Sequence, residues 1–184
     1  PLVIGGTLLF IGHTLFSNFL VYIMENVGGT EDQMGIAGAL AGFLEIIPLF
    51  SYNFLRKKLP DRVWLMISTI FFTVKGILLV IAVNPDMIYF AQSAQMLAYG
   101  LFTPAFTYFA HQIVERKDMV QGQAVTMVVG MFGGALGSFL AGVVMGQFGV
   151  SASLLMATIV SGIGTVICIA GLTKGSKKLR TQAS

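Results

Sequence analysis

The feature that most constrains this chain is a succession of six apolar runs, each long enough to cross a lipid bilayer as a helix. A bilayer core about 30 Å thick requires roughly 20 apolar residues in helical form. Only 10% of the residues are charged, against about 25% in a typical soluble domain, so a water-exposed surface could not be covered. Strands cross lipid only as closed barrels and need about half that length. The sequence therefore predicts an all-α polytopic transmembrane bundle with helices at about 2–27, 34–55, 63–83, 87–114, 119–148 and 152–173.

Lysine and arginine are confined almost entirely to alternate connectors between these runs. They are Arg56, Lys57, Lys58 and Arg62 in the second connector, Arg116 and Lys117 in the fourth, and four more in a tail at 174–184. Because basic residues accumulate on the cytoplasmic side of a membrane, we expect these connectors and both termini to be cytoplasmic. The sequence predicts a six-helix transmembrane domain at 1–173 and a basic cytoplasmic tail at 174–184. The net charge of +3 then reflects orientation in the bilayer and not nucleic-acid binding.

Two ionisable residues lie in the middle of predicted spans, Glu45 in the second and Lys75 in the third. At 1.5 Å per residue, both are roughly 15–18 Å from the cytoplasmic face. Adjacent antiparallel helices at matched depth could bring the two head groups into contact. One interpretation is a proton or substrate site gated by making and breaking this pair, since ionisable groups in a membrane are usually functional. The other is a static ion pair, or a Lys75 side chain that extends toward the interface.

Two other spans carry stripes of polar side chains. Gln92, Gln95 and Tyr99 follow the spacing i, i+3, i+7 of one helical face. A second strip in the first span includes His13, Asn18 and Tyr22. Polar groups in lipid must face protein or a watery cavity, so these residues are candidates for binding a hydroxylated solute. The alternative is hydrogen bonding between helices, which for His13 means a core residue rather than a titrating one.

Glycine and proline in the spans indicate close packing and bending. The fifth span contains three GxxxG pairs, which favour close approach of two helix backbones; they are Gly130/Gly134, Gly133/Gly137 and Gly142/Gly146. Pro48 and Pro104 each remove a backbone hydrogen bond within a span and predict kinks.

No enzyme signature is present in the sequence. HExxH, GxSxG, Walker and CxxC motifs are missing, and two distant histidines make no metal site. We therefore predict no catalytic residue, no metal, no cofactor and no nucleic-acid partner. The partners to expect are the lipid bilayer, a small polar solute and protons.

Four segments give the chain a resemblance to a known family: residues 43–50 (FLEIIPLF), 73–76 (TVKG), 99–105 (YGLFTPA), and Gly122-Gln123 with the glycine-rich run that follows. With these motifs the chain resembles the C-terminal half of a major facilitator superfamily transporter, of the lactose permease type of oligosaccharide–proton symporter. The resemblance covers nearly the whole chain. It implies a bundle of two inverted three-helix repeats, with a solute site near the bilayer midplane. It also implies a bacterial inner membrane location.

The resemblance further implies roles for particular residues, with departures. Glu45 matches a sugar-binding glutamate and Lys75 falls where an arginine takes part in proton coupling. Gln92, Gln95 and Ala98 stand where lactose permease has a lysine, a histidine and a proton-carrying glutamate. The chain begins at Pro1 within an apolar run and without a signal peptide. We therefore expect an N-terminal transporter half, in the same polypeptide, as its partner.

These patterns favour a secondary transporter that moves a sugar or nucleoside by proton symport with alternating access. A second hypothesis is drug or metabolite efflux on the same fold, because 11% of the residues are aromatic. A third is a six-helix structural or channel-forming protein that is complete by itself and forms a homodimer.

Overall fold

The secondary structure in residues 1–113 and 119–182, which the computed structural model describes, is entirely helical. The elements are α1 (Leu2–Asn18), α2 (Leu20–Asn26), α3 (Glu31–Leu55), α4 (Asp61–Val80), α5 (Pro85–Ser93), the short 3-10 helix η1 (Ala94–Met96), α6 (Tyr99–Ile113) and α7 (Met119–Gln182). The prediction of an all-α fold is confirmed. Side chains at 111, 113–123, 125–126 and 174–182 are not described, so the predictions made for Arg116, Lys117 and the basic tail lie outside the described residues.

Short polar sequences start two of the helices. Before α3, the Thr30 side chain accepts a hydrogen bond from the Gln33 backbone N–H, and Gln33 Oε1 accepts one from the Thr30 N–H at 3.0 Å. This reciprocal capping box occupies two donors that a helix start leaves free. Before α5, the Asn84 side chain accepts from the Met87 N–H, and Pro85 follows in the first turn. Both starts lie in connectors that the sequence marks as breaks between spans.

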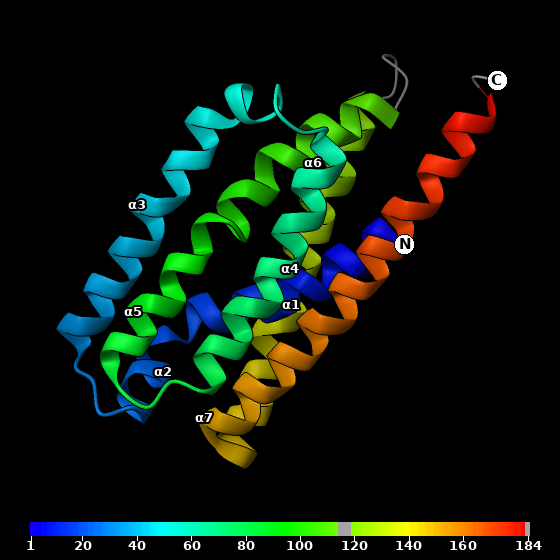
Figure 1. Cartoon of the computed structure of the whole chain (residues 1–184). Helices are drawn as coiled ribbons and strands as arrows, with labels where there is room; N and C mark the ends of the chain where they lie inside the picture. The colour runs from blue at the N-terminus through cyan, green and yellow to red at the C-terminus, as the bar shows by residue number, and fades with distance from the viewer. Residues whose placement is uncertain (114–118, 183–184) are drawn as a thin grey trace.

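A backbone turn at Gly149 divides α7 into two arms, the first covering 119–148 and the second 150–182. Gly149 has φ +83°, a left-handed conformation that glycine adopts without a steric penalty. Figure 1 shows the chain folding back at this point, so that the yellow and orange arms run in opposite directions. The 47-residue apolar segment Met127–Thr173 therefore supplies two membrane-crossing arms.

Two other spans are interrupted. Helices α1 and α2 are long and apolar enough to cross a membrane only when they are taken together as one span, and they are bent by 63° at their junction. The span predicted at 87–114 is divided into α5, η1 and α6. Helices α3 and α4 are continuous spans of 25 and 20 residues. Within the described residues the bundle thus has six spanning units. They are the bent pair α1–α2, the single helices α3 and α4, the interrupted segment from α5 to α6, and the two arms of α7.

Helix α1 packs against both arms of α7. A Cβ atom built on Gly133 or Gly137 of the first arm would lie 2.8 Å from the Thr7 carbonyl oxygen or 2.6 Å from that of Ile11. Such distances are shorter than real Cβ contacts, so these two positions require glycine for the observed spacing. Gly130 and Gly134 also face α1, near Phe10 and Thr14, whereas Gly142 and Gly146 have open space around them.

We expect Gly137→Ala to destabilise the folded protein by about 1–3 kcal/mol, because the new methyl group would push α1 away from the first arm of α7. Thermal unfolding of the purified protein in detergent measures this. Gly142→Ala, further along the same arm and with no atom within 4 Å of the added methyl, is the matched control and should unfold as the parent does. Equal unfolding temperatures for both variants would contradict the close contact at Gly137.

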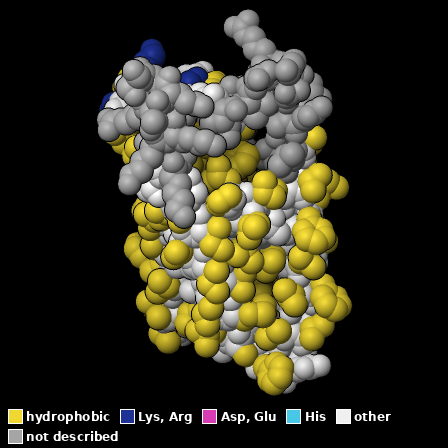
Figure 2. Space-filling model, turned by 90° about the vertical axis from the view of Figure 1, so that its right-hand side faces the viewer, with side chains coloured by type: hydrophobic (Ala, Val, Ile, Leu, Met, Phe, Trp, Pro, Cys, Tyr) yellow, Lys and Arg dark blue, Asp and Glu magenta, His cyan; other side chains and the backbone are white. Residues whose placement is uncertain are grey.

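The outer surface of the bundle is apolar between its two ends. Large exposed side chains include Phe43 (66%), Phe50 (86%) and Phe90 (66%). Figure 2 shows hydrophobic side chains over most of one face, with Lys and Arg visible only near its upper edge. One end of the bundle holds Arg56, Lys57 and Lys58 in the connector between α3 and α4, together with Arg62 in the first turn of α4, and we call it the basic end. A surface of this kind suits a multi-pass protein in contact with lipid.

Candidate functional site

A hydrogen-bonded chain of three polar side chains crosses the middle of the bundle. Lys75 of α4 donates from Nζ to Gln95 Oε1 at 2.6 Å, and Gln95 Nε2 donates to Glu45 Oε1 of α3 at 2.6 Å. The sequence suggested direct contact between Glu45 and Lys75; the structure instead places the Gln95 amide between them. The two ionisable groups are therefore linked, with a neutral amide separating their charges. We call Glu45, Gln95 and Lys75 the relay.

The relay is buried at its Lys75 end and more exposed at its Glu45 end. Lys75 is 1% exposed and Gln95 2% exposed, whereas Glu45 is half-buried. Gln92, one turn before Gln95, is also buried, and its Oε1 has no hydrogen-bond partner among the described residues. A buried ammonium group needs a partner, because its loss of hydration is costly. In the described structure the Gln95 carbonyl oxygen meets that need for Lys75.

Irregular backbone places Gln95 between α3 and α4. Gln95 lies within η1, where the spacing of hydrogen bonds changes from the α-helical to the 3-10 pattern. Short 3-10 stretches within a longer helix often mark functional sites. Five residues later, a Cβ built on Gly100 would lie 3.0 Å from both Glu45 Cα and Pro48 Cγ. This close approach of α6 and α3 brings the Glu45 carboxylate within reach of the Gln95 amide.

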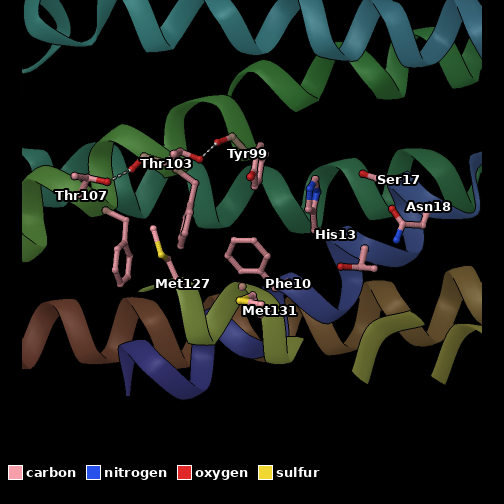
Figure 3. A pocket seen from close by; sticks show the side chains of 13 residues that line it. Phe10, His13, Ser17, Asn18, Tyr99, Thr103, Thr107, Met127 and Met131 are labelled. Atoms are coloured by element: carbon pink, nitrogen blue, oxygen red, sulfur yellow. Dashed lines mark hydrogen bonds between the residues drawn. The ribbon is translucent and has the colours of Figure 1, made fainter. Parts of the chain in front are cut away.

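A pocket of about 470 Å³ opens between α1, α6 and the first arm of α7. Its centre is aromatic: the His13 and Tyr99 rings stack with centroids 4.5 Å apart, and Phe10 lies edge-on to Tyr99 at 6.0 Å. Figure 3 shows Phe10 between Met131 and Tyr99, with His13, Ser17 and Asn18 at one end and Thr107 with Met127 at the other. The residues that line the pocket are Phe10, His13, Thr14, Ser17, Asn18, Tyr99, Phe102, Thr103, Phe106, Thr107, Met127, Gly130 and Met131.

The residues singled out in the sequence fall at three places. Glu45, Lys75 and Gln95 form the relay, with Gln92 beside it along the chain; His13, Asn18 and Tyr99 line the pocket. Tyr22 instead lines a second cavity of about 450 Å³, together with Gly142 and Gly146. Helices α3 and α6 continue through Pro48 and Pro104.

Sequence reasoning missed the apolar half of the pocket. Phe10, Phe102, Phe106, Met127 and Met131 all line it. In the sequence these residues stand in apolar runs, where a side chain that faces a cavity has the same identity as one that faces lipid. The only signal in the sequence was position, since Phe10 and Phe102 lie three residues from His13 and Tyr99 and share their helix faces.

A second polar network closes the basic end of the bundle around Asp61. This carboxylate is 3% exposed and accepts hydrogen bonds from the Tyr52 hydroxyl (2.8 Å), Arg56 Nη2 (3.0 Å) and Gln112 Nε2 (2.6 Å). The Arg56 guanidinium also lies 4.0 Å from the centre of the Tyr108 ring. Since these residues come from α3, the α3–α4 connector, α4 and α6, Asp61 ties three helices together. Arg56–Asp61 is the one salt bridge found among the described residues.

This geometry can hold an uncharged solute close to a pair of ionisable groups. The described residues that line the pocket include no Asp, Glu, Lys or Arg, and Tyr99 of the lining follows Gln95 of the relay by four residues. No group of three or more His, Cys, Asp and Glu side chains among the described residues is placed to hold a metal ion. The described side chains offer hydrogen bonding and aromatic contact to a solute.

Comparison with known proteins gives one family. The family model described as Major Facilitator Superfamily matches residues 2–183. No curated protein matches the chain.

Proposed function

The chain belongs to the Major Facilitator Superfamily, whose members are membrane transporters, and from that premise we propose that it is the C-terminal half of a proton-coupled symporter for a small polar solute, a sugar or a nucleoside. The observation that carries this proposal is the relay, in which two ionisable groups of apolar helices are joined through one amide. Intramembrane ionisable groups of this kind characterise ion pathways in transporters. The pocket beside the relay supplies a place for the solute.

Proton coupling follows from the charges in the relay. With Glu45 ionised and Lys75 protonated, the relay has no net charge, and the Gln95 amide donates to the carboxylate. When Glu45 takes up a proton, the buried Lys75 ammonium is left without a compensating charge, which is unfavourable in a medium of low dielectric. A protonated relay is therefore expected to favour a different helix arrangement from an ionised one. Coupling requires only that the solute prefer the protonated arrangement.

The N-terminal half of the same transporter is the partner in this proposal. Several pocket side chains are open to the surroundings, among them Met127 (68%) and Met131 (76%) on the first arm of α7 and Ser17 and Asn18 on α1. A second bundle placed against α1 and α7 would close the pocket around a solute near the midplane, as in transporters built from two halves. In this arrangement the basic end, together with both termini, faces the cytoplasm of a bacterial inner membrane.

Solute-driven proton movement tests the proposal. The full-length transporter is reconstituted into liposomes with a pH-sensitive dye inside, and the membrane potential is clamped with valinomycin and equal potassium. A panel of neutral sugars and nucleosides is then added outside. We expect a member of the panel to enter and acidify the interior. Uptake of these solutes without any acidification would contradict proton symport.

Efflux is a second candidate, and the apolar half of the pocket favours it. Phe10, Phe102 and Phe106 face thioether side chains across the pocket, which suits a lipophilic solute as well as a polar one. In the same liposomes, an exporter would release protons as a lipophilic solute moves in the opposite direction. Antiport with lipophilic solutes and no movement of sugars or nucleosides would favour efflux over symport.

A further inference from the structure

The pocket has an uncharged lining in the part of the chain that the structure describes. Thirteen described residues line it, and none of them is Asp, Glu, Lys or Arg. A charged group on a solute would find no counter-charge among these lining side chains, and burying a charge without one is costly. Organic anions and phosphorylated sugars are therefore expected to bind poorly to these side chains.

The middle of the pocket is a preformed aromatic surface. Phe10 makes edge-to-face contacts with His13 (6.1 Å between centroids), Tyr99 (6.0 Å) and Phe102 (5.8 Å). His13 and Tyr99 are nearly parallel, with 5° between their planes. These are the arrangements that aromatic pairs prefer, so the rings hold one another in place before a solute binds.

Methionine side chains complete the apolar part of the pocket. Met127 and Met131 of α7 lie near Phe10 in Figure 3 and are largely exposed. Thioethers are polarisable, adapt to irregular shapes and make favourable contacts with aromatic rings. A flat aromatic ring would therefore be bound here by ring edges and by sulfur, with no requirement for hydrogen bonds.

Two further polar side chains lie at the other end of the pocket. Figure 3 places Ser17 and Asn18 together at the end beyond His13. Both side chains are exposed, and the described residues provide neither with a hydrogen bond. By contrast, the hydroxyls of Thr103 and Thr107 already donate to carbonyl oxygens of their own helix, at 3.2 Å and 2.9 Å. The pocket thus has an aromatic part, where His13 Nδ1 is buried without a hydrogen-bond partner among the described residues, and an end that carries a hydroxyl and an amide.

From this division we infer that the pocket binds an uncharged solute in which a flat aromatic ring is joined to a hydroxylated group. Nucleosides and aryl glycosides share this chemistry, whereas a plain sugar has hydroxyls on all sides and would leave several of them against Phe and Met side chains. The volume of about 470 Å³ lies within the range of roughly 300–1,000 Å³ typical of small-molecule sites. This inference rests on the proposed function and narrows its solute class.

Competition in the reconstituted full-length transporter tests the inference. Four probes are compared: uridine as a nucleoside, nitrophenyl galactoside as an aryl glycoside, lactose as a plain sugar, and tetraphenylphosphonium as a lipophilic cation. We expect uridine or nitrophenyl galactoside to be taken up with protons, and lactose to compete at least tenfold more weakly. Transport of uridine would identify the solute as a nucleoside, and transport of nitrophenyl galactoside would identify it as an aryl glycoside.

Variants at the two ends of the pocket locate the effect. Met131→Ala should weaken the binding of the ring compounds about fivefold and leave the binding of lactose unchanged. Asn18→Ala should weaken the binding of the ring compounds and of lactose alike. Both residues are exposed, so neither change removes a core side chain. Phe132→Ala is the matched control, because Phe132 is exposed on the next position of α7 but lines a different groove, with Val3 and Ile4.

The outcomes separate this inference from the proposed function. Proton-coupled uptake of lactose that the ring compounds do not inhibit would overturn the inference and leave proton symport intact. Transport of tetraphenylphosphonium would also overturn it. If no probe moves with protons, proton symport is refuted, and the inference is then tested by binding. A ring compound that raises the unfolding temperature of the parent, but not that of the Met131→Ala protein, supports the inference. No rise in the unfolding temperature of the parent overturns it.

Discussion

Replacing Glu45 with glutamine is expected to lower proton-coupled uptake about 100-fold or more while the protein stays folded. A glutamine carbonyl oxygen can still accept the hydrogen bond that Gln95 Nε2 gives to Glu45 at 2.6 Å, so the relay keeps its shape. The amide cannot take up or release a proton, which removes the step that links proton movement to the solute. A 100-fold loss of rate corresponds to about 2.7 kcal/mol of activation free energy. Uptake driven by a pH gradient measures it.

Solute exchange without a pH gradient should persist in the Glu45→Gln protein at a rate within about threefold of the parent, a difference of about 0.7 kcal/mol. This contrast separates lost coupling from lost binding. Glu31→Gln is the matched control, since Glu31 is an exposed carboxylate in the first turn of the same helix. Full pH-dependent uptake by the Glu45→Gln protein would refute a coupling role for Glu45.

Removing the Asp61 carboxylate is expected to destabilise the folded protein more than Gly137→Ala does. Asp61→Ala leaves the Tyr52 hydroxyl, the Arg56 guanidinium and the Gln112 amide without their shared acceptor at the basic end. Loss of a buried charged partner commonly costs about 3–5 kcal/mol. Because the Arg56 side chain is 33% exposed and can be partly hydrated, we expect about 2–4 kcal/mol. Thermal or denaturant unfolding in detergent measures the difference.

Two further substitutions define what Asp61 contributes. Asp61→Asn keeps the size and one acceptor oxygen, so it should fall between the parent and Asp61→Ala. Asp86→Ala removes an exposed carboxylate in the first turn of α5 and should change stability by less than about 1 kcal/mol. If Asp61→Ala and Asp86→Ala unfold alike, the network around Asp61 does not hold α3, α4 and α6 together.

Much of the fold could be predicted from the sequence because membrane spanning is a local requirement. Each span must satisfy its own backbone hydrogen bonds, so a long apolar run specifies a helix whatever its neighbours are. The gaps between predicted spans also contain two helix starts, where Thr30 caps α3 and Asn84 caps α5. The interruptions could not be predicted in this way: the bend between α1 and α2 and the 3-10 turn at η1 lie within runs that read as continuous helices.

Part of the candidate site was also visible in the sequence. Glu45, Lys75 and Gln95 stood out because polar groups in a lipid-spanning run are costly and need partners. Their depth in the membrane followed from counting residues at 1.5 Å each. The partner of each residue did not follow, since depth places two groups at the same level without giving their separation across the bundle.

The sequence by itself determined that this chain is a helical membrane protein and which polar residues lie at its middle. Only the tertiary structure decided that Gln95 stands between Glu45 and Lys75, and that Phe10 and Met131 face a pocket rather than lipid. The physical reason is the range of the interactions. Hydropathy and helix periodicity act within one segment, whereas the rotation of each helix about its axis and the distance between helices depend on packing contacts such as those at Gly100 and Gly137.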